Sequence, residues 1–432
     1  MPEAAKTFYT SKTPYHPFQD LTSYSEAPAG YVPVFVEHVA RHGSRLLSSK
    51  KYDDLAYQLW EEAEKDGGLT TLGQTFGPEA LKMTAVNEEL GYGSLSGLGA
   101  TEHGDMARRV FTRQQQFFEA AAKDGEHIQI VTSGNDRAVD SGANFADALE
   151  AASSSLKGLV DEPKANEDLL YFHKAAANAG YQEYVDSDPR VKAAIKSIEK
   201  SEPVNAAARD MLEQIFTTSF VDRLAAGEFD FVDHGKGTKH LKDVASAADS
   251  IYNLYLIAPG MKDEGDWDFE KFVPAKDAEQ LAYLLDAQDF YEKGPGFEGD
   301  DITYKMADVL LDDFFAQIQQ KVDGTSKLAG DFRFAHAEII FPFATLLGLE
   351  GSTKQAAEGE IYTYGNNPWR GETVAPMAAN VQWDVYKDAN NNYAVRMLYN
   401  EKEVSFKNGC EPLSPGSFFY SFDGLKECYG QS

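Results

Sequence analysis

Five consecutive residues, Arg41-His42-Gly43-Ser44-Arg45, combine side chains that could do chemistry on an anion. An imidazole can attack phosphorus directly when a phosphate is held in line with it. Two arginines can clamp the phosphate oxygens and offset the charge of the transition state. Gly43 allows the backbone to turn tightly beside the anion. The group indicates phosphoryl chemistry with His42 as nucleophile; the alternative is a surface arginine pair around a buried histidine.

Two further groups could complete such a site. Arg137 could supply a third phosphate contact, although it could also be a surface residue at the start of a helix. In His336-Ala337-Glu338, a histidine can donate to phosphate and a carboxylic acid can protonate a departing alkoxide. If these three residues are extended, both side chains project to one side, whereas in a helix they diverge. Lys51 could reach a neighbouring phosphate, as could Lys293; solvated surface lysines are the alternative.

Each of the three groups follows a segment typical of a buried strand, at residues 31–39, 127–132 and 331–336. Helical patterns cover residues 52–65, 78–90, 100–122, 304–320 and 337–347, and another follows residue 135 as far as 152. Alternating strands and helices predict an α/β fold, a mixed sheet flanked by helices. Ligands in such folds bind at strand ends, which is where the three groups lie.

The domain organisation follows from a change of composition near residue 150. Residues 149–299 are rich in Ala, Glu, Lys and Asp at helical spacing, which predicts a mainly helical insertion covering the active site, with a less ordered loop at 233–242. Residues 27–148 and 300–432 form the predicted α/β core, preceded by an extended lead-in at 1–28. Residues 381–387 and 393–399 predict a hairpin at the sheet edge.

Composition excludes several classes of protein. The chain has 432 residues, of which 43% are hydrophobic and 12% aromatic, as in globular proteins. No apolar run approaches the length of a membrane-spanning helix. The net charge of −29 argues against nucleic acid or an anionic membrane as partner. A phosphate site in this chain must therefore concentrate its positive charge in one pocket.

The two cysteines, Cys410 and Cys428, both lie in the C-terminal tail. A lone pair near the terminus is typical of a disulfide in an exported chain, and two unpaired thiols are the alternative. The N-terminus lacks the pattern of a signal peptide, which leaves either a cytosolic protein or a mature exported one. The cysteines favour export, to an extracellular or cell-surface location.

These motifs resemble the histidine acid phosphatase family over nearly the whole chain. His-Ala-Glu at 336–338, in place of the His-Asp usual in that family, and residues 291–296 (YEKGPG) are similar to the branch called multiple inositol polyphosphate phosphatase. The resemblance implies that His42 becomes a phosphohistidine and that Glu338 is the proton donor. It assigns the transferred phosphate to Arg41, Arg45, Arg137 and His336. Leu46-Leu47 replaces the aromatic–proline pair that often follows the first motif, which bears on the shape of that loop.

The resemblance implies stepwise removal of phosphates from inositol hexakisphosphate (phytate), by a monomer that needs no metal or cofactor. A broad acid phosphatase or a bisphosphoglycerate phosphatase is the enzymatic alternative. A non-catalytic surface protein that binds anions is the alternative of another class. The intact set of His42, three arginines, His336 and Glu338 counts against it, because a binder needs neither nucleophile nor proton donor.

Overall fold

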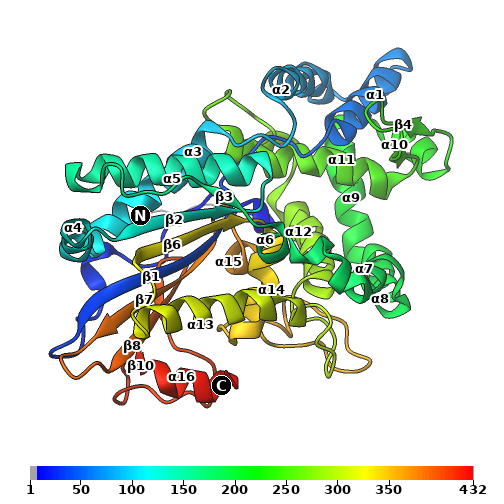
Figure 1. Ribbon diagram of the computed structural model, residues 1–432. Helices are drawn as coiled ribbons and strands as arrows, with labels where there is room; N and C mark the ends of the chain where they lie inside the picture. Colours follow the sequence, from blue (N-terminus) through cyan, green and yellow to red (C-terminus); the bar gives the residue numbers. More distant parts are fainter. Residues whose placement is uncertain (1–6, 432) are drawn as a thin grey trace.

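The computed structural model describes residues 7–431. Its main feature is a mixed β-sheet with helices on both faces (Figure 1). The strand order is β10-β8-β7-β1-β6-β2-β3, and the short β9 pairs with β8. Strands β1, β6, β2 and β3 are mutually parallel, whereas β7, β8 and β10 pair antiparallel. The strands are β1 (Val32–Arg41), β2 (His127–Thr132), β3 (Lys164–Ala165), β6 (Leu328–Ala335), β7 (Asn380–Lys387), β8 (Tyr393–Tyr399), β9 (Lys402–Val404) and β10 (Phe419–Ser421). The predicted α/β class is confirmed.

The central strand β1 is buried on both faces, because its alternate side chains enter two different apolar clusters. Val36 and Ala40 pack with α3 (Gly97–Arg113) and α5 (Asp136–Ala152). Phe35 and Val39 pack on the other face with α13 (Asp308–Val322) and α14 (Ala337–Leu347). Figure 1 shows these two helix pairs on opposite sides of the sheet. The predicted strands at 31–39, 127–132 and 331–336 correspond to β1, β2 and β6.

A group of helices lies above and to the right of the sheet in Figure 1. They are α1 (Lys51–Lys65), α2 (Phe76–Leu90), α6 (Glu167–Leu170), α7 (Ala179–Ser187), α8 (Pro189–Glu199), α9 (Glu202–Ile215), α10 (Thr218–Ala225), α11 (Val244–Ile257) and α12 (Ala275–Glu292). Helices α1 and α2 share one apolar cluster with α9, α10, α11 and α12. Residues 51–90 thus pack against the helical region. The boundaries 27–148, 149–299 and 300–432 stay a prediction.

The predicted hairpin forms, but its expected place at the sheet edge is wrong. Strand β7 lies between β1 and β8, and β8 in turn pairs with β9 and β10. Asp388 fixes the turn by accepting hydrogen bonds from the backbone N–H groups of Asn390 and Asn392, at 2.9 and 2.8 Å. A local pattern can identify a hairpin, whereas its neighbours in the sheet depend on distant strands.

Two other local expectations need correction. The single helix predicted at 100–122 is divided at Gln114, whose backbone (φ −122°, ψ 24°) ends α3 before α4 (Gln115–Asp124) begins. The loop at 233–242 belongs to a small hairpin of β4 (Phe231–Val232) and β5 (His240–Leu241). Asp233 organises its turn by accepting hydrogen bonds from four backbone N–H groups, of residues 236–239. These bonds, led by that of Lys239, lower the pKa of Asp233 to about 2.

The remaining segments lie around the sheet and its helices. Within the described part of the lead-in lie two short 3₁₀ turns, η1 (Thr10–Lys12) and η2 (Leu21–Ser23); residues 1–6 are outside the described range. Cys410 and Cys428 form a disulfide, as predicted, which joins α16 (Phe422–Tyr429) to the loop after β9. A short helix, α15 (Gly371–Val374), precedes β7. Between residues 7 and 431 no helix has the length and apolar character needed to cross a membrane.

Candidate active site

Three parallel strands bring the predicted groups together. In the sheet register Arg41 of β1 lies opposite Ala335 of β6, and Thr132 of β2 opposite Phe334. The residues that follow, His42, Ser133 and His336, therefore emerge side by side at the carboxyl edge of the sheet. The rings of His42 and His336 lie 5.6 Å apart between centroids. The expectation that strand ends assemble this cluster is confirmed.

The His42 imidazole is buried and held in one tautomer. Its side chain is buried (3% exposed), and its Nδ1 lies 2.9 Å from the carbonyl oxygen of Gly43. Because a carbonyl can only accept, Nδ1 carries the proton and Nε2 keeps its lone pair. Burial lowers the pKa of His42 well below its ordinary value, and Arg41, Arg137, His336 and Arg45 lower it further. The imidazole is therefore neutral and unprotonated at Nε2.

The loop after β1 is held by its close contact with α3. A Cβ on Gly43 would lie 2.6 Å from the carbonyl oxygen of Gly99, so only glycine fits there. Glu102 accepts hydrogen bonds from the backbone N–H and the hydroxyl of Ser44, at 2.6 and 2.8 Å. These contacts fix the backbone on which His42 and the following arginine stand.

Three arginines lie around the imidazole, and among the described residues none of them forms an ion pair with a carboxylate. Arg41 donates through Nη1 to the backbone carbonyls of Ser11 and Ala375, the latter at 2.6 Å. Arg45 donates to the carbonyl of Leu46 at 2.8 Å. Within residues 7–431 the buried Nε of Arg41, Arg45 and Arg137 has no hydrogen-bond partner. Donors left free in this way are suited to binding an anion.

The mutual repulsion of these cations contributes to a lowered pKa of their guanidinium groups. Burial lowers the pKa of Arg45 to about 9, and the charges of Arg137 and Arg41 act in the same direction. Burial also lowers the pKa of Arg41 to about 10, although the Glu338 carboxylate opposes the shift. A bound phosphate would relieve this repulsion, since it supplies the missing negative charge.

His336 is fixed in a defined tautomer. Its Nε2 lies 2.8 Å from the hydroxyl of Ser133, and its Nδ1 lies 3.4 Å from Nη2 of Arg137. Because arginine can only donate, Nδ1 is the acceptor and Nε2 carries the proton. Burial and the charge of Arg137 lower the pKa of His336 to about 3, so the ring is neutral. The ring of Tyr171 packs edge-on against it at 5.1 Å.

Residues 336–338 are neither fully extended nor fully helical, the two geometries considered from the sequence. His336 is the extended N-cap of α14 (φ −133°, ψ 169°), whereas Glu338 lies in the first helical turn. The two side chains nevertheless lie close enough for each to shift the pKa of the other. Burial raises the pKa of Glu338, but Lys293, His173 and His336 together hold it well below its ordinary value. The carboxyl group is therefore ionised before substrate binds.

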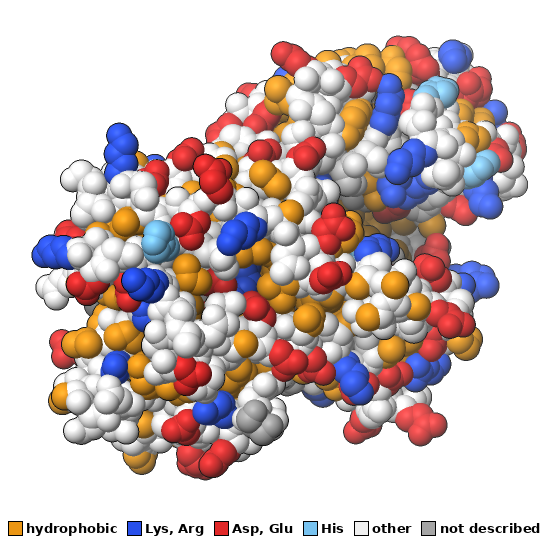
Figure 2. All heavy atoms as spheres, viewed as in Figure 1, with side chains coloured by type: hydrophobic (Ala, Val, Ile, Leu, Met, Phe, Trp, Pro, Cys, Tyr) orange, Lys and Arg blue, Asp and Glu red, His pale blue; other side chains and the backbone are white. Residues whose placement is uncertain are grey.

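Beyond the arginines opens a cavity of about 360 Å³. Five cationic residues line it: Lys12, Arg45, Lys51, Lys239 and Lys293. Asp249 and Asp289 are the acidic residues in its wall; the first pairs with Lys239 and the second with Lys293, at 2.7 Å. The predicted Lys51 lies here, with its ammonium 4.8 Å from the Tyr52 ring. Lys50 instead points to Glu88. The cavity is rich in positive charge despite the acidic surface visible in Figure 2.

Sequence reasoning missed several residues of this cluster. Lys12 comes from the lead-in, where no pattern marks it. Tyr171 and His173 come from the helical region, with their rings 4.5 Å apart. Burial lowers the pKa of His173 to about 4. Ser133 directly follows β2, and only its place after a strand end could have indicated it.

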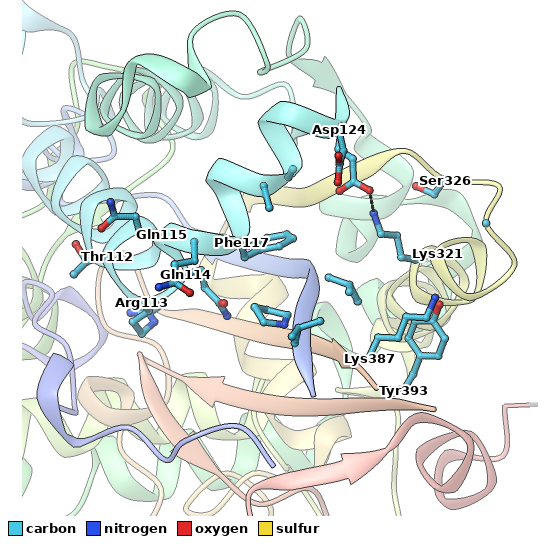
Figure 3. Close-up of a pocket in the computed structure, with 18 residues that line it drawn as sticks. Thr112, Arg113, Gln114, Gln115, Phe117, Asp124, Lys321, Ser326, Lys387 and Tyr393 are labelled. Atoms are coloured by element: carbon cyan, nitrogen blue, oxygen red, sulfur yellow. Dashed lines mark hydrogen bonds and ion pairs between the residues drawn. The ribbon is translucent and has the colours of Figure 1, made fainter. Parts of the chain in front are cut away.

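A larger cavity, of about 840 Å³, lies at the opposite edge of the parallel strands (Figure 3). It is lined by the start of β1, by α4 and by the ends of the β7–β8 hairpin, with Arg113, Gln114 and Lys387 among its polar residues. None of the predicted site residues contributes to it. Volume alone is therefore a poor guide here, because two of the predicted site residues, Arg45 and Lys51, line the smaller cavity and none lines the larger one.

Residues 34–400 match the family described as histidine phosphatase superfamily (branch 2). This chain belongs to that superfamily. The histidine phosphatase is similar to the multiple inositol polyphosphate phosphatase of Bifidobacterium longum in complex with phosphate, at 39% identity over 98% of this chain and 97% of the other, with a TM-score of 0.95. The same protein in complex with inositol hexasulfate gives 40% identity, the same coverage and a TM-score of 0.93.

A phytase from D. castellii shares the fold, with a TM-score of 0.62 and 14% identity over 98% of this chain and 84% of the other. Comparison with curated proteins finds no match. The family and branch expected from Arg41–Arg45 and His-Ala-Glu are confirmed by these relatives.

Proposed function

We propose that this histidine phosphatase removes phosphates stepwise from inositol polyphosphates, with phytate as its best substrate. The observation that carries the proposal is a neutral, buried His42 among three arginines, next to a cavity lined by five cations. The Bifidobacterium relative, whose name and inositol hexasulfate complex concern the same class of compound, supports the choice of substrate. A substrate with many phosphates is the kind of anion that such a cavity can bind.

In the first step Nε2 of His42 attacks phosphorus, the new N–P bond forms and the ester P–O bond breaks. Arg41, Arg45 and Arg137 hold the phosphoryl oxygens as charge develops on them. The ring becomes cationic when phosphorylated, and its Nδ1–H remains hydrogen-bonded to the Gly43 carbonyl. Glu338 gives a proton to the departing inositol oxygen.

Glu338 must first acquire that proton, since its carboxyl group is ionised in the free enzyme. A phosphate bound among the arginines brings negative charge close to Glu338, which raises the pKa that Lys293, His173 and His336 hold low in the free enzyme. We infer that the proton is taken up together with the substrate. In the second step water attacks the phosphohistidine, Glu338 accepts the proton from that water, and the P–N bond breaks to regenerate neutral His42.

Phosphate release from phytate by the wild type and by His42→Ala, with and without a chelator, tests the proposal. Activity that survives the chelator and disappears in the variant supports both the nucleophile and the substrate class. A wild type that cleaves small monoesters but not phytate would keep the family and overturn the substrate, favouring a broad acid phosphatase or a bisphosphoglycerate phosphatase. A burst of product equal to the enzyme concentration would separate an enzyme from an anion-binding protein.

We also propose that the protein is a monomer and acts outside the cell or at its surface. The Cys410–Cys428 disulfide supports this location, because such bonds persist in oxidising compartments. A helical domain at 149–299 that covers the site is supported by the cavity wall, to which Lys239, Asp249 and Lys293 contribute. Light scattering at two protein concentrations would test the monomer.

A further inference from the structure

The segment before β1 runs beside Arg41 and is tied to the helical region. We call residues 8–13 the N-terminal strap; they precede residues 34–400, over which the superfamily match extends. The hydroxyl of Tyr252 donates to the carbonyl of Phe8 at 2.6 Å, and Tyr9 donates to Glu270 at 2.6 Å. The strap is therefore a fixed part of the molecule, held by residues of the helical region.

The strap carries a backbone outlier beside the catalytic cluster. Thr10 is buried (4% exposed) and has a φ of +49°, a left-handed conformation that disfavours a β-branched residue. The turn directs the Ser11 carbonyl toward Arg41, whose Nη1 donates to it. On its other side the strap touches Gly371, where a Cβ would lie 2.9 Å from the backbone nitrogen of Ser11. Strain of this kind persists where the surrounding structure demands it, and it is concentrated at functional sites.

The same turn places Lys12 in the wall of the cationic cavity. Within the described residues its ammonium has one hydrogen-bond partner, the hydroxyl of Ser11 at 3.2 Å, so two of its three donors are left over. Burial lowers the pKa of Lys12 to about 8; Asp289 opposes this shift, and Arg41, Arg45 and Lys293 add to it. A cation held among other cations with free donors is suited to an anionic ligand.

We propose that Lys12 binds a phosphate of the inositol polyphosphate other than the one being transferred. The inference rests on the proposed function. The cavity that Lys12 lines includes Arg45 and Lys51 but not His42, so its ammonium faces the part of the substrate that remains after transfer. Lys12 is thus a specificity-determining residue that favours substrates with several phosphates over those with one.

The test compares Lys12→Met with the wild type on phytate and on 4-nitrophenyl phosphate, which has a single phosphate. Loss of one charge-assisted hydrogen bond should lower kcat/KM on phytate by about 10–100-fold. The value on 4-nitrophenyl phosphate should stay within about threefold, and Lys12→Arg should restore part of the preference for phytate. Lys50→Met is the matched control, since Lys50 pairs with Glu88 outside the cavity.

Equal losses on the two substrates would overturn the proposal, because they would mean that Lys12 only supports the fold or Arg41. An unchanged kcat/KM on phytate would overturn it as well. Calorimetric titration with inositol hexasulfate, which this mechanism does not turn over, measures the same contact without catalysis. If the wild type binds inositol hexasulfate, with a weaker affinity in Lys12→Met, but does not hydrolyse phytate, the proposed function fails and the binding role of Lys12 stands.

Discussion

Replacing Glu338 by glutamine tests the proton donor, and the structure predicts opposite effects on chemistry and on binding. Glutamine keeps the shape of the side chain but cannot give a proton to the leaving oxygen. General acid catalysis contributes about 10²–10⁴-fold, so kcat on phytate should fall by about that factor. With 4-nitrophenyl phosphate, whose leaving group departs without a proton, the loss should stay below about tenfold.

Phosphate binding should become tighter in Glu338→Gln, although the chemical step becomes slower. The Glu338 carboxylate raises the pKa of Arg41, Arg45 and Arg137, which means that it stabilises their positive charge and offsets part of it. Its removal leaves the cluster more positive, so inorganic phosphate should inhibit Glu338→Gln more strongly than the wild type. The assay is initial-rate kinetics on both substrates, with phosphate as inhibitor. Equal losses of kcat on the two substrates, or weaker inhibition by phosphate, would refute the reasoning.

Four further outcomes are expected. His42→Ala should lose all burst and steady-state activity on both substrates, measured by rapid quench. Arg333→Met should lower the free energy of unfolding by about 3–5 kcal/mol in urea, because Arg333 pairs with Glu37, Asp331 and Asp313 in the core. Reducing the Cys410–Cys428 bond, which closes a loop of 18 residues, should lower it by about 3 kcal/mol. His103, whose pKa burial lowers from 6.5 to about 3, stays neutral in the folded state, so His103→Phe should flatten the loss of stability on acidification.

The direction of the His103→Phe effect follows from proton uptake by His103 in the unfolded state. As the pH falls below 6.5, unfolded His103 binds a proton that the folded state excludes until pH about 3. Stability should therefore fall by about 1.4 kcal/mol per pH unit in that window, and the His103→Phe variant should lack this contribution. A parallel pH profile for the variant would contradict the assignment.

The Arg333 and disulfide predictions can each be checked further. Arg190, an exposed arginine paired with Asp188 and Asp300, serves for Arg333: its replacement by methionine should cost less than about 1 kcal/mol. Similar costs at the two positions would mean that the buried network contributes little. An unfolding midpoint unaffected by reduction would show that the disulfide is dispensable for stability.

The strands that form the site could be predicted because their signal is local. β1 and β2 are rich in apolar and β-branched residues, and β6 carries Phe332 and Phe334 at alternate positions. Each strand is followed at once by a polar group that could do chemistry. The place of β7 between β1 and β8 could not be predicted, because pairing partners distant in the chain decide it. The break at Gln114 was missed for another reason: neither glycine nor proline marks it.

The residues of the candidate site could also be predicted only where a local pattern marks them. His42, Arg137 and His336 lie where strand ends meet, which the sequence pattern could indicate. Lys12 and His173 come from segments without a motif, and only the folded chain brings them to the cavity. Whether Glu338 faces the cluster could not be decided either, since it depends on where α14 begins.

The strap also has a consequence for the order in which the protein is made. Residues 8–13 are synthesised before the residues that secure this region. The Glu270 carboxylate follows Tyr9 by 261 residues, and the Ala375 carbonyl follows Arg41 by 334 residues. The cationic centre therefore cannot be completed until most of the chain has left the ribosome. Until then the nascent protein would carry His42 without a finished anion site, so phosphate binding should appear as a late event in folding.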